Sequence, residues 1–394
     1  MRITLVTETF PPEVNGAAGS LHRLVAGLSA RGHRLVVVRP RFPMAGIENA
    51  PPPDWEEWPV ASVPLPGYSA LRVGLPAGRK LVRRWRADRP DVVHVATEGP
   101  LGWSAVIAAR RLGIPVSSSF HTNFHSFAAH YRAAPLRRAT LCYLRTLHNL
   151  TRRTLVPSVT VRDELDRAGF RNLGILGRGV DTDLFGPVRR DSHLRRVWGA
   201  GPETPVVIHV GRLASEKNPG LLVDSFEAMR RLHRPAPRLV LVGDGPARRR
   251  LEREHPDYHF AGMRSGEDLA RHYASGDLFL FPSLTETFGN VVPEAMSSGL
   301  VVLAFDYAAA GQCIRFGENG WLVPRRDARA FTATAAALMA RVPEWPRVRR
   351  AARQTALALS WPAVVDEFER ALQEVGSSAA AAPTRMASTT RSRT

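Results

Sequence analysis

Two glutamates in one short stretch, "LTETFGNVVPEAMSSG" at residues 284–299, are the first candidates for chemistry. Glu286 precedes Glu294 by eight residues, and the stretch contains no base. Pro293 and Gly299 are typical of the first turn and the end of a short helix, so Glu286 is expected in a loop and Glu294 in the helix's first turn. Carboxylates accept hydrogen bonds from paired hydroxyls. We therefore expect one acid to bind a sugar and the other a ribose.

Backbone donors lie between the two acids. Phe288, Gly289 and Asn290 stand where the predicted helix begins, and the first N–H groups of a helix have no acceptor within it. These N–H groups are available to a ligand. Because no base stands in the stretch, we expect the acids to meet their cations only through that ligand.

The cations are predicted in "GRLASEKN" (211–218), directly after the apolar run "PVVIHV". Arg212 and Lys217 suit a diphosphate, which accepts a forked arginine and a compact ammonium together. Lys217 is one of only two lysines in a chain whose other bases are arginine, which favours a specific role. The alternative is a solvated charged turn.

Two further stretches carry candidate ligand-binding residues. Asn15 and Gly16 precede a helical pattern, and a glycine there lets backbone N–H groups approach an anion, although the three-glycine dinucleotide spacing is absent. His121, His125 and His130 have spacings that could hold a metal, but no acid or cysteine completes the set. We expect no metal, and His121 is expected to point into a cleft.

The apolar runs that must position these residues come in two series. They lie at 3–8, 34–40, 91–97, 115–120 and 154–158, and then at 205–212, 238–245, 277–283 and 300–306. Continuous apolar runs are typical of parallel strands buried on both faces, so two Rossmann-like, doubly wound α/β domains are predicted. Ligands bind beyond the carboxyl ends of such strands, where each candidate stands.

The chain of 394 residues is too long for one core, and its domain limits follow from the two series. We predict a first domain at 1–178, a second at 179–355, a helix at 356–375 and a disordered tail at 376–394. The joint contains Asp181-Thr182-Asp183, a DxD triplet that resembles a metal motif. Its place between domains favours hinge structure instead.

The net charge of +18 indicates phosphate-rich partners, either nucleic acid, anionic lipid or a nucleotide, unless it reflects a general bias toward arginine. The arginines are spread widely and no nucleic-acid reader motif is visible, so nucleic acid is not expected. No apolar run approaches the length of a membrane span, and the two cysteines have no metal or redox spacing. A cytoplasmic protein is expected.

Taken in order, the "NG" of residues 15–16, "GRLASEK", "VGDGP" (242–246) and "ETFGNVVPEAMSSG" resemble the retaining glycosyltransferases of family 4, over residues 1 to about 375. "EGPLGWSA" and "FHTNFHSF" resemble the bacterial α-mannosyltransferases that use GDP-mannose. The resemblance implies the GT-B fold, with two domains facing across a cleft and the C-terminal helix returning to the first. It also implies a reaction without a metal or other cofactor.

The same resemblance implies a role for each candidate. Glu286 would contact the donor sugar, helped by N–H groups of Phe288 and Gly289, and Glu294 would hold the ribose. Arg212 and Lys217 match the family's diphosphate cations, and Gly16 matches its phosphate loop. His121 matches a histidine near the sugar. Gly262 and Met263 of "FAGM" match the region that lies against the base.

The acceptor is expected to be a glycolipid or glycan bound by the first domain. Residues 78–89 and 131–153 mix arginine with leucine, tryptophan and tyrosine at helical spacing. Such helices either contact anionic lipid at the inner face of the plasma membrane or bury ordinary apolar faces in the core. Two alternatives to mannosyl transfer remain, a hexosyltransferase using a UDP-sugar and a sugar-nucleotide epimerase on the same fold.

Overall fold

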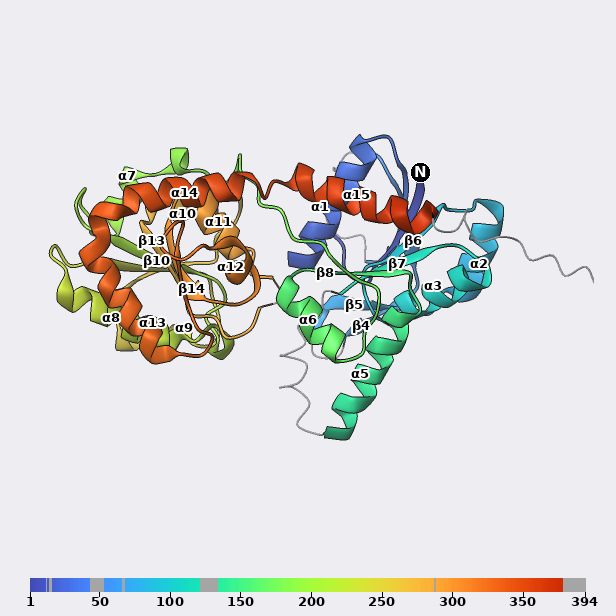
Figure 1. Cartoon of the computed structure of the whole chain (residues 1–394), viewed down its shortest axis with the longest axis horizontal. Coiled ribbons are helices and arrows are strands. Elements are labelled where there is room, and N and C mark those ends of the chain that lie inside the picture. Colours follow the sequence, from blue (N-terminus) through green and yellow to red (C-terminus); the bar gives the residue numbers. More distant parts are fainter. Residues whose placement is uncertain are drawn as a thin grey trace, which may run out of the picture.

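The computed structural model describes residues 1–11, 13, 16–42, 53–65, 68–120, 134–286 and 288–377. The predictions for Asn15, for the histidines at 121, 125 and 130, and for most of the tail fall outside these residues. The described chain forms two α/β units that lie side by side along the long axis of the molecule (Figure 1).

The first unit contains a seven-stranded sheet in the order β3-β2-β1-β6-β7-β8-β9, with parallel pairing throughout. Its strands are β1 (Arg2–Val6), β2 (Arg34–Pro40), β3 (Glu56–Val60), β6 (Val92–Val95), β7 (Val116–Ser119), β8 (Arg153–Val156) and β9 (Leu173–Ile175). Its helices are α1 (Gly16–Ala30), α2 (Gly78–Ala87), α3 (Pro100–Arg111), α5 (Ala134–Asn149) and α6 (Val159–Arg167). An antiparallel hairpin joins β4 (Ser62–Leu65) to β5 (Tyr68–Gly74).

The second unit contains a six-stranded parallel sheet in the order β12-β11-β10-β13-β14-β15. Its strands are β10 (Val206–Val210), β11 (Arg238–Val242), β12 (His259–Gly262), β13 (Leu278–Phe281), β14 (Val301–Phe305) and β15 (Trp321–Val323). Its α-helices are α7 (Ser192–Val197), α8 (Pro219–Leu232), α9 (Arg248–Glu254), α10 (Gly266–Ser275), α11 (Val291–Ser297), α12 (Ala308–Cys313), α13 (Ala328–Leu338) and α14 (Trp345–Leu357). Short 3₁₀ turns occupy Pro187–Arg189, Ser215–Lys217 and Met339–Glu344.

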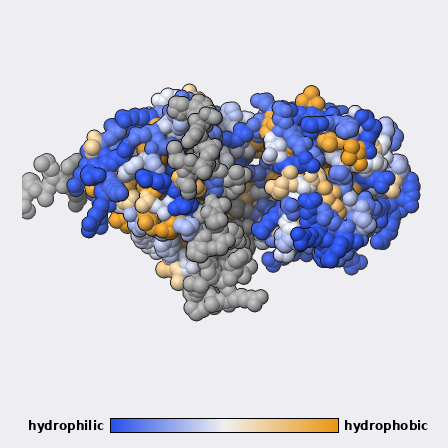
Figure 2. All heavy atoms as spheres, turned by 180° about the vertical axis from the view of Figure 1, so that it is seen from behind, coloured by the Kyte–Doolittle hydropathy of each residue, from blue (hydrophilic) through white to orange (hydrophobic). Residues whose placement is uncertain are grey.

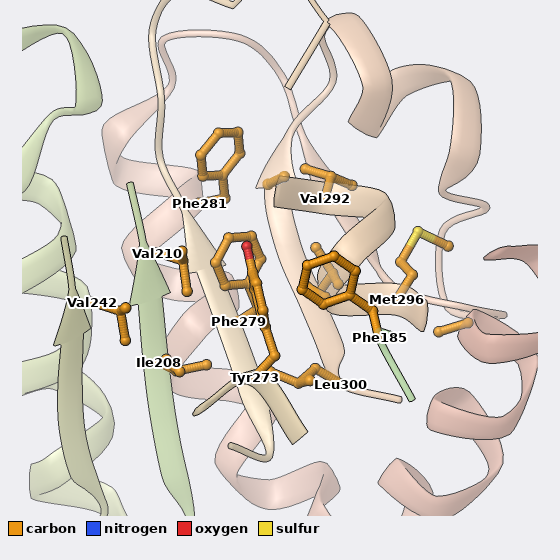
Figure 3. Packing of buried hydrophobic residues seen from close by; sticks show 14 of the residues in the cluster. Phe185, Ile208, Val210, Val242, Tyr273, Phe279, Phe281, Val292, Met296 and Leu300 are labelled. Carbon is orange, nitrogen blue, oxygen red and sulfur yellow. The ribbon is translucent and has the colours of Figure 1, made fainter. Parts of the chain in front are cut away.

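The apolar strand runs are buried on both faces, as parallel sheets covered by helices require. Every residue of β10 and β14 is buried. Figure 3 shows one face of the second sheet, where the ring of Tyr273 in α10 packs against Phe279 of β13 and against Phe185. The predicted pair of Rossmann-like α/β units is confirmed.

The last helix, α15 (Trp361–Ser377), leaves the second unit and packs on the first, beside α1 (Figure 1). Phe368 meets the ring of His94 in β6 edge to face, with the ring centroids 4.9 Å apart. A Cβ atom at Gly27 of α1 would lie 2.6 Å from Val365, so this close approach requires a glycine. The predicted return of the C-terminal helix is confirmed.

Two chain segments connect the units, and they lie side by side. Val180 and Ser360 form a parallel bridge, in which the Val180 N–H donates to the carbonyl of Leu359 at 2.9 Å. Asp181, the first residue of the DxD triplet, accepts the N–H of Leu184 at 2.9 Å and pairs with Arg23 of α1. The triplet therefore lies where the chain crosses between the units, and its hinge role and the exact domain limits stay predictions.

Two fully buried histidines should make stability depend on pH. Burial lowers the pKa of His94 to about 3 and of His209 to about 4, whereas both titrate near 6.5 when unfolded. Because the native state binds fewer protons, stability present above pH 6.5 is lost as the pH falls toward 4. At pH 5 each histidine should cost about 2 kcal/mol of unfolding free energy.

Urea unfolding at pH 7 and pH 5 checks this expectation. Between pH 7 and pH 5, the unfolding free energy of His94→Gln should fall by about 2 kcal/mol less than that of the wild type. The reason is that the unfolded variant has no imidazole at position 94 to take up a proton. The exposed His193 provides the control, and His193→Gln should behave as the wild type does. An identical loss in wild type and His94→Gln would contradict the prediction.

Candidate active site

The candidates of the second unit lie at one edge of its sheet. Arg212 and Lys217 follow β10, Gly262 ends β12 with Met263 next to it, and Glu286 follows β13. All three strands run parallel, so their carboxyl ends meet at the same edge. This is the edge at which open parallel sheets bind ligands.

Glu286 and Lys217 contact each other directly in this crevice. The Lys217 ammonium forms an ion pair with Oε1 of Glu286, and the Ser283 hydroxyl donates to the same oxygen at 2.7 Å. Only 18% of the Lys217 side chain and 14% of the Glu286 side chain are exposed. The expectation that the acids meet cations only through a ligand is therefore wrong for Glu286. A half-buried carboxylate needs a compensating charge even when no ligand is bound.

The loop that carries Glu286 is held on both sides. The Tyr307 hydroxyl donates to the Glu286 carbonyl at 3.0 Å, and Arg325 lies 3.7 Å above the Tyr307 ring while donating to the Leu284 carbonyl. Gly289 has φ +91°, a conformation that favours glycine, and a Cβ atom there would lie 3.4 Å from Cγ of Glu286. The loop geometry thus orients the carboxylate.

Glu294 lies in the first turn of α11 and is bound by a tyrosine from the core. The Tyr273 hydroxyl, at the end of a side chain that is fully buried, donates to Oε2 of Glu294 at 3.0 Å. Burial raises the pKa of Glu294 to about 7, while the Tyr273 hydrogen bond and the positive charge of Arg23 act in the opposite direction. The carboxylate is therefore poised to change its charge near neutral pH.

The two units meet at the start of α1. A Cβ atom on Gly16 would lie 3.8 Å from Nη1 of Arg178 and 3.8 Å from Nδ2 of Asn290. One residue at the end of the first unit and one residue of the second unit therefore approach this glycine. Arg178 is 8% exposed and donates to the Gly16 carbonyl and the Ser20 hydroxyl, each at 3.0 Å. Burial lowers the pKa of Arg178 only to about 10, so it stays charged beside the helix start.

The other predicted residues differ in accessibility. Arg212 is exposed and makes no side-chain hydrogen bond or ion pair with any residue in the described ranges. Met263 is 73% exposed at the end of β12, and its neighbour Gly262 has φ +73°. Phe288 is 3% exposed, so it can offer only its backbone. In the part of the chain that the structure describes, no three metal-ligating side chains come together.

Sequence reasoning missed the residues that support the candidates. Ser283 could have been suspected, because a hydroxyl three positions before a candidate acid at a strand end can reach its carboxylate. Tyr273 and Tyr307 carry no such signal, since they approach Glu294 and Glu286 from distant parts of the chain. Arg178 stands at the predicted joint, where its role depends on how the units pack.

Two family profiles together match most of the chain. The profile described as "Glycosyltransferase Family 4" matches residues 14–184, and the profile "Glycosyl transferases group 1" matches residues 204–341. The first match includes α1 and the sheet of the first unit. The second includes Arg212, Lys217, Glu286 and Glu294.

Individual proteins are similar over comparable lengths. A "GDP-mannose-dependent alpha-mannosyltransferase" of Mycobacterium tuberculosis is 37% identical, with 93% of this chain and 95% of that protein covered. An "Alpha-monoglucosyldiacylglycerol synthase" of Acholeplasma laidlawii is 26% identical, with 81% and 84% covered. The solved structure of Anabaena Alr3699/HepE in complex with UDP superposes with a TM-score of 0.75 at 19% identity, covering 95% of this chain and all of that one. At that identity the superposition establishes the GT-B fold alone.

Proposed function

The chain belongs to glycosyltransferase family 4, and from that premise we propose that it transfers mannose from GDP-mannose, with retention of configuration, to a glycolipid or glycan acceptor. The observation that carries the proposal is the Lys217–Glu286 pair, held at the edge of the second sheet with Glu294 eight residues further on. The mannosyl donor is supported by the printed activity of the relative that is 37% identical.

The charges suit the breaking of a bond between an anomeric carbon and a diphosphate. Positive charge develops on the sugar ring and negative charge on the leaving oxygen, which the two cations Arg212 and Lys217 stabilise. Lys217 is already half-buried and oriented, so little reorganisation remains when it turns from Glu286 to the diphosphate. Glu286 is then free to accept hydrogen bonds from the sugar hydroxyls.

Glu294 holds the ribose in this proposal, with Tyr273 fixing one of its oxygens. The start of α1, with Gly16 supported by Arg178, faces the diphosphate from the first unit. No side chain is assigned as a covalent nucleophile. The acceptor hydroxyl attacks from the face that the diphosphate leaves, and a phosphate oxygen takes its proton.

A donor panel tests the proposal. GDP-mannose should raise the thermal midpoint more than UDP-glucose, UDP-galactose or GDP-glucose at equal concentration, and product analysis should find an α-mannoside. If UDP-glucose stabilised the protein more strongly and a glucoside were formed, the donor would be UDP-glucose and not GDP-mannose. Conversion of the sugar nucleotide without any acceptor would instead indicate an epimerase.

Nucleotide binding should depend on pH through Glu294. Its pKa of about 7 means that about a tenth of the carboxylate is ionised at pH 6 and about nine tenths at pH 8. Because ribose hydroxyls donate to the ionised form, GDP affinity should fall about tenfold from pH 8 to pH 6. Isothermal titration calorimetry at the two pH values measures this change.

Two variants separate the effect of Glu294 ionisation on GDP affinity from the effect of protonating GDP itself. Glu294→Gln should bind GDP more weakly but should lack the extra pH dependence, and only the contribution of the phosphates should remain. Tyr273→Phe removes the hydrogen bond that lowers the pKa of Glu294, so its affinity loss should begin at a higher pH. If the GDP affinity of the wild type changed with pH in the same way as that of Glu294→Gln, Glu294 would not be the group that makes GDP binding depend on pH.

Contact with an anionic membrane is part of the proposal, through charge rather than insertion. In α2, Leu81 and Trp85 are buried in the core, while Arg79, Lys80 and Arg83 are exposed. Among the described helices, none is long and apolar enough to span a bilayer. The face in Figure 2 is mainly hydrophilic, with hydrophobic residues in small separate patches.

Flotation with anionic and neutral liposomes tests this membrane contact. Lys and Arg near an anionic surface contribute about 1 kcal/mol each, so binding should require anionic lipid and be lost at high salt. Binding that persists in high salt would indicate apolar insertion instead. Absence of binding at low salt would remove membrane contact from the proposal without affecting the donor assignment.

A further inference from the structure

A basic groove of about 510 Å³ lies on the first unit, apart from the residues assigned to the donor. Three cations line it, Arg41 after β2, Arg72 in β5 and Lys80 near the start of α2, together with Phe42 and Trp58. None of the described residues that line the groove is acidic. Its volume is of the size that small-molecule sites occupy.

The cations keep donors available for a ligand. Arg72 donates from Nε to the Ser62 hydroxyl at 2.8 Å and from Nη2 to the Ser62 carbonyl at 3.1 Å, which fixes the guanidinium plane. Within the described residues, Nη1 of Arg72 and the side chains of Arg41 and Lys80 make no hydrogen bond or ion pair. The groove therefore combines one oriented guanidinium with two adaptable cations.

The acids next to the groove are neutralised by arginines that do not line it. Glu57 accepts Nε of Arg39 at 2.7 Å, and Glu56 pairs with Arg84 of α2. These pairs leave the positive charge of the lining residues uncompensated. A concave surface of one sign concentrates ions of the opposite sign.

The groove lies on the same edge of the first sheet as the start of α1. It is built where β2 and β3 end, and the parallel strand β1 ends at that edge as well. Glu8, in the segment that leads from β1 to α1, accepts the N–H of Gly74 at 2.6 Å. Gly74 pairs with Ser62, the residue that orients Arg72. The groove is thus tied to the segment that faces the donor site.

We infer that this groove binds an acidic group, a carboxylate or a phosphate, on the head group of the acceptor, with Arg72 and Lys80 as its principal partners. The inference rests on the proposed function, because it takes the first unit to bind the acceptor. A forked guanidinium and an ammonium recognise either anion by charge-assisted hydrogen bonds. Phe42 and Trp58, which also line the groove, offer apolar surface to the carbon framework that carries the anion.

Calorimetric titration with soluble head-group analogues tests the groove directly. The protein is first saturated with GDP, so that the cations assigned to the donor are occupied. sn-Glycerol 3-phosphate and methyl α-D-glucuronide are then compared with the neutral probes glycerol and methyl α-D-glucoside. At least one acidic probe should bind and its neutral counterpart should not. The acidic probe that binds identifies the anion as a phosphate or a carboxylate.

A matched pair of double variants separates the groove from general surface charge. Arg72→Gln with Lys80→Gln should weaken binding of the acidic probe by about tenfold or more. Arg79→Gln with Arg83→Gln removes the same charge from exposed positions of α2 outside the groove, and should leave binding unchanged. GDP affinity should be unchanged in both.

Two results would overturn the inference. One is binding of neither acidic probe, and the other is an equal loss in the groove and control variants. Failure of the proposed function looks different, because wild-type protein would then show no preference for GDP or GDP-mannose. In that case the titration is repeated without GDP, and the groove variants still report on anion binding at the groove.

Discussion

Arg212→Ala is expected to lower kcat/KM for GDP-mannose by about 10²- to 10³-fold, the loss of about 3 to 4 kcal/mol that follows removal of one preorganised partner of a developing negative charge. Arg212 is exposed, and its side chain has no hydrogen bond or ion pair within the described ranges. Its removal should therefore leave stability almost unchanged. Steady-state kinetics and thermal unfolding of the same preparation measure both quantities.

The control for Arg212→Ala is Arg249→Ala, another exposed arginine of the second unit, in α9. It removes the same charge without touching the residues assigned to the diphosphate, so its kcat/KM should remain close to the wild-type value. Arg212→Lys should recover part of the activity, since it restores the charge but not the forked geometry. Near-normal turnover of Arg212→Ala would remove Arg212 from the diphosphate site.

Glu286→Gln is expected to lower kcat by about 10²- to 10³-fold while GDP affinity stays equal to the wild type or improves. The carboxylate is assigned to the sugar hydroxyls, so its loss acts on the reacting part of the donor. Lys217 loses its ion-pair partner and becomes fully available to the diphosphate. Single-turnover kinetics and calorimetry separate these two effects.

Glu294→Gln is the matched comparison, because it makes the same chemical change eight residues away in the same stretch. It should weaken GDP binding while kcat at saturating donor is largely retained. Ser283→Ala should resemble a mild Glu286→Gln, since it removes one hydrogen bond of 2.7 Å and leaves the ion pair. Equal effects of Glu286→Gln and Glu294→Gln on kcat and on GDP affinity would contradict the division of roles.

Much of the fold could be predicted from the sequence because its causes are local. A continuous apolar run such as that of β10 can be buried only as a strand covered on both faces, wherever it stands in the chain. Pro293 and Gly299 likewise predict the short helix α11 from their own backbone preferences, and the helix spans Val291–Ser297. The rule that parallel strands end at one edge then placed Arg212, Lys217 and Glu286 together.

The membrane-facing interpretation shows where local patterns stop being sufficient. Residues 78–89 have the composition of a helix that could insert at a lipid surface, and the same composition suits a helix packed on a core. The structure buries Leu81 and Trp85 of α2, and most of the exposed residues of this helix are cations. Amphipathicity determines that an apolar face will be buried, and the rest of the fold determines against what.

The sequence by itself determined the two-unit α/β fold and the sheet edge at which the candidate residues gather, because residue type and strand periodicity are properties of short segments. Only the tertiary structure decided their partners. Lys217 pairs with Glu286 across 69 positions, Tyr273 reaches Glu294 from the core, and Arg178 supports Gly16 across 162 positions. Such contacts depend on how helices and sheets pack, and the pKa of Glu294 depends on the same packing through burial.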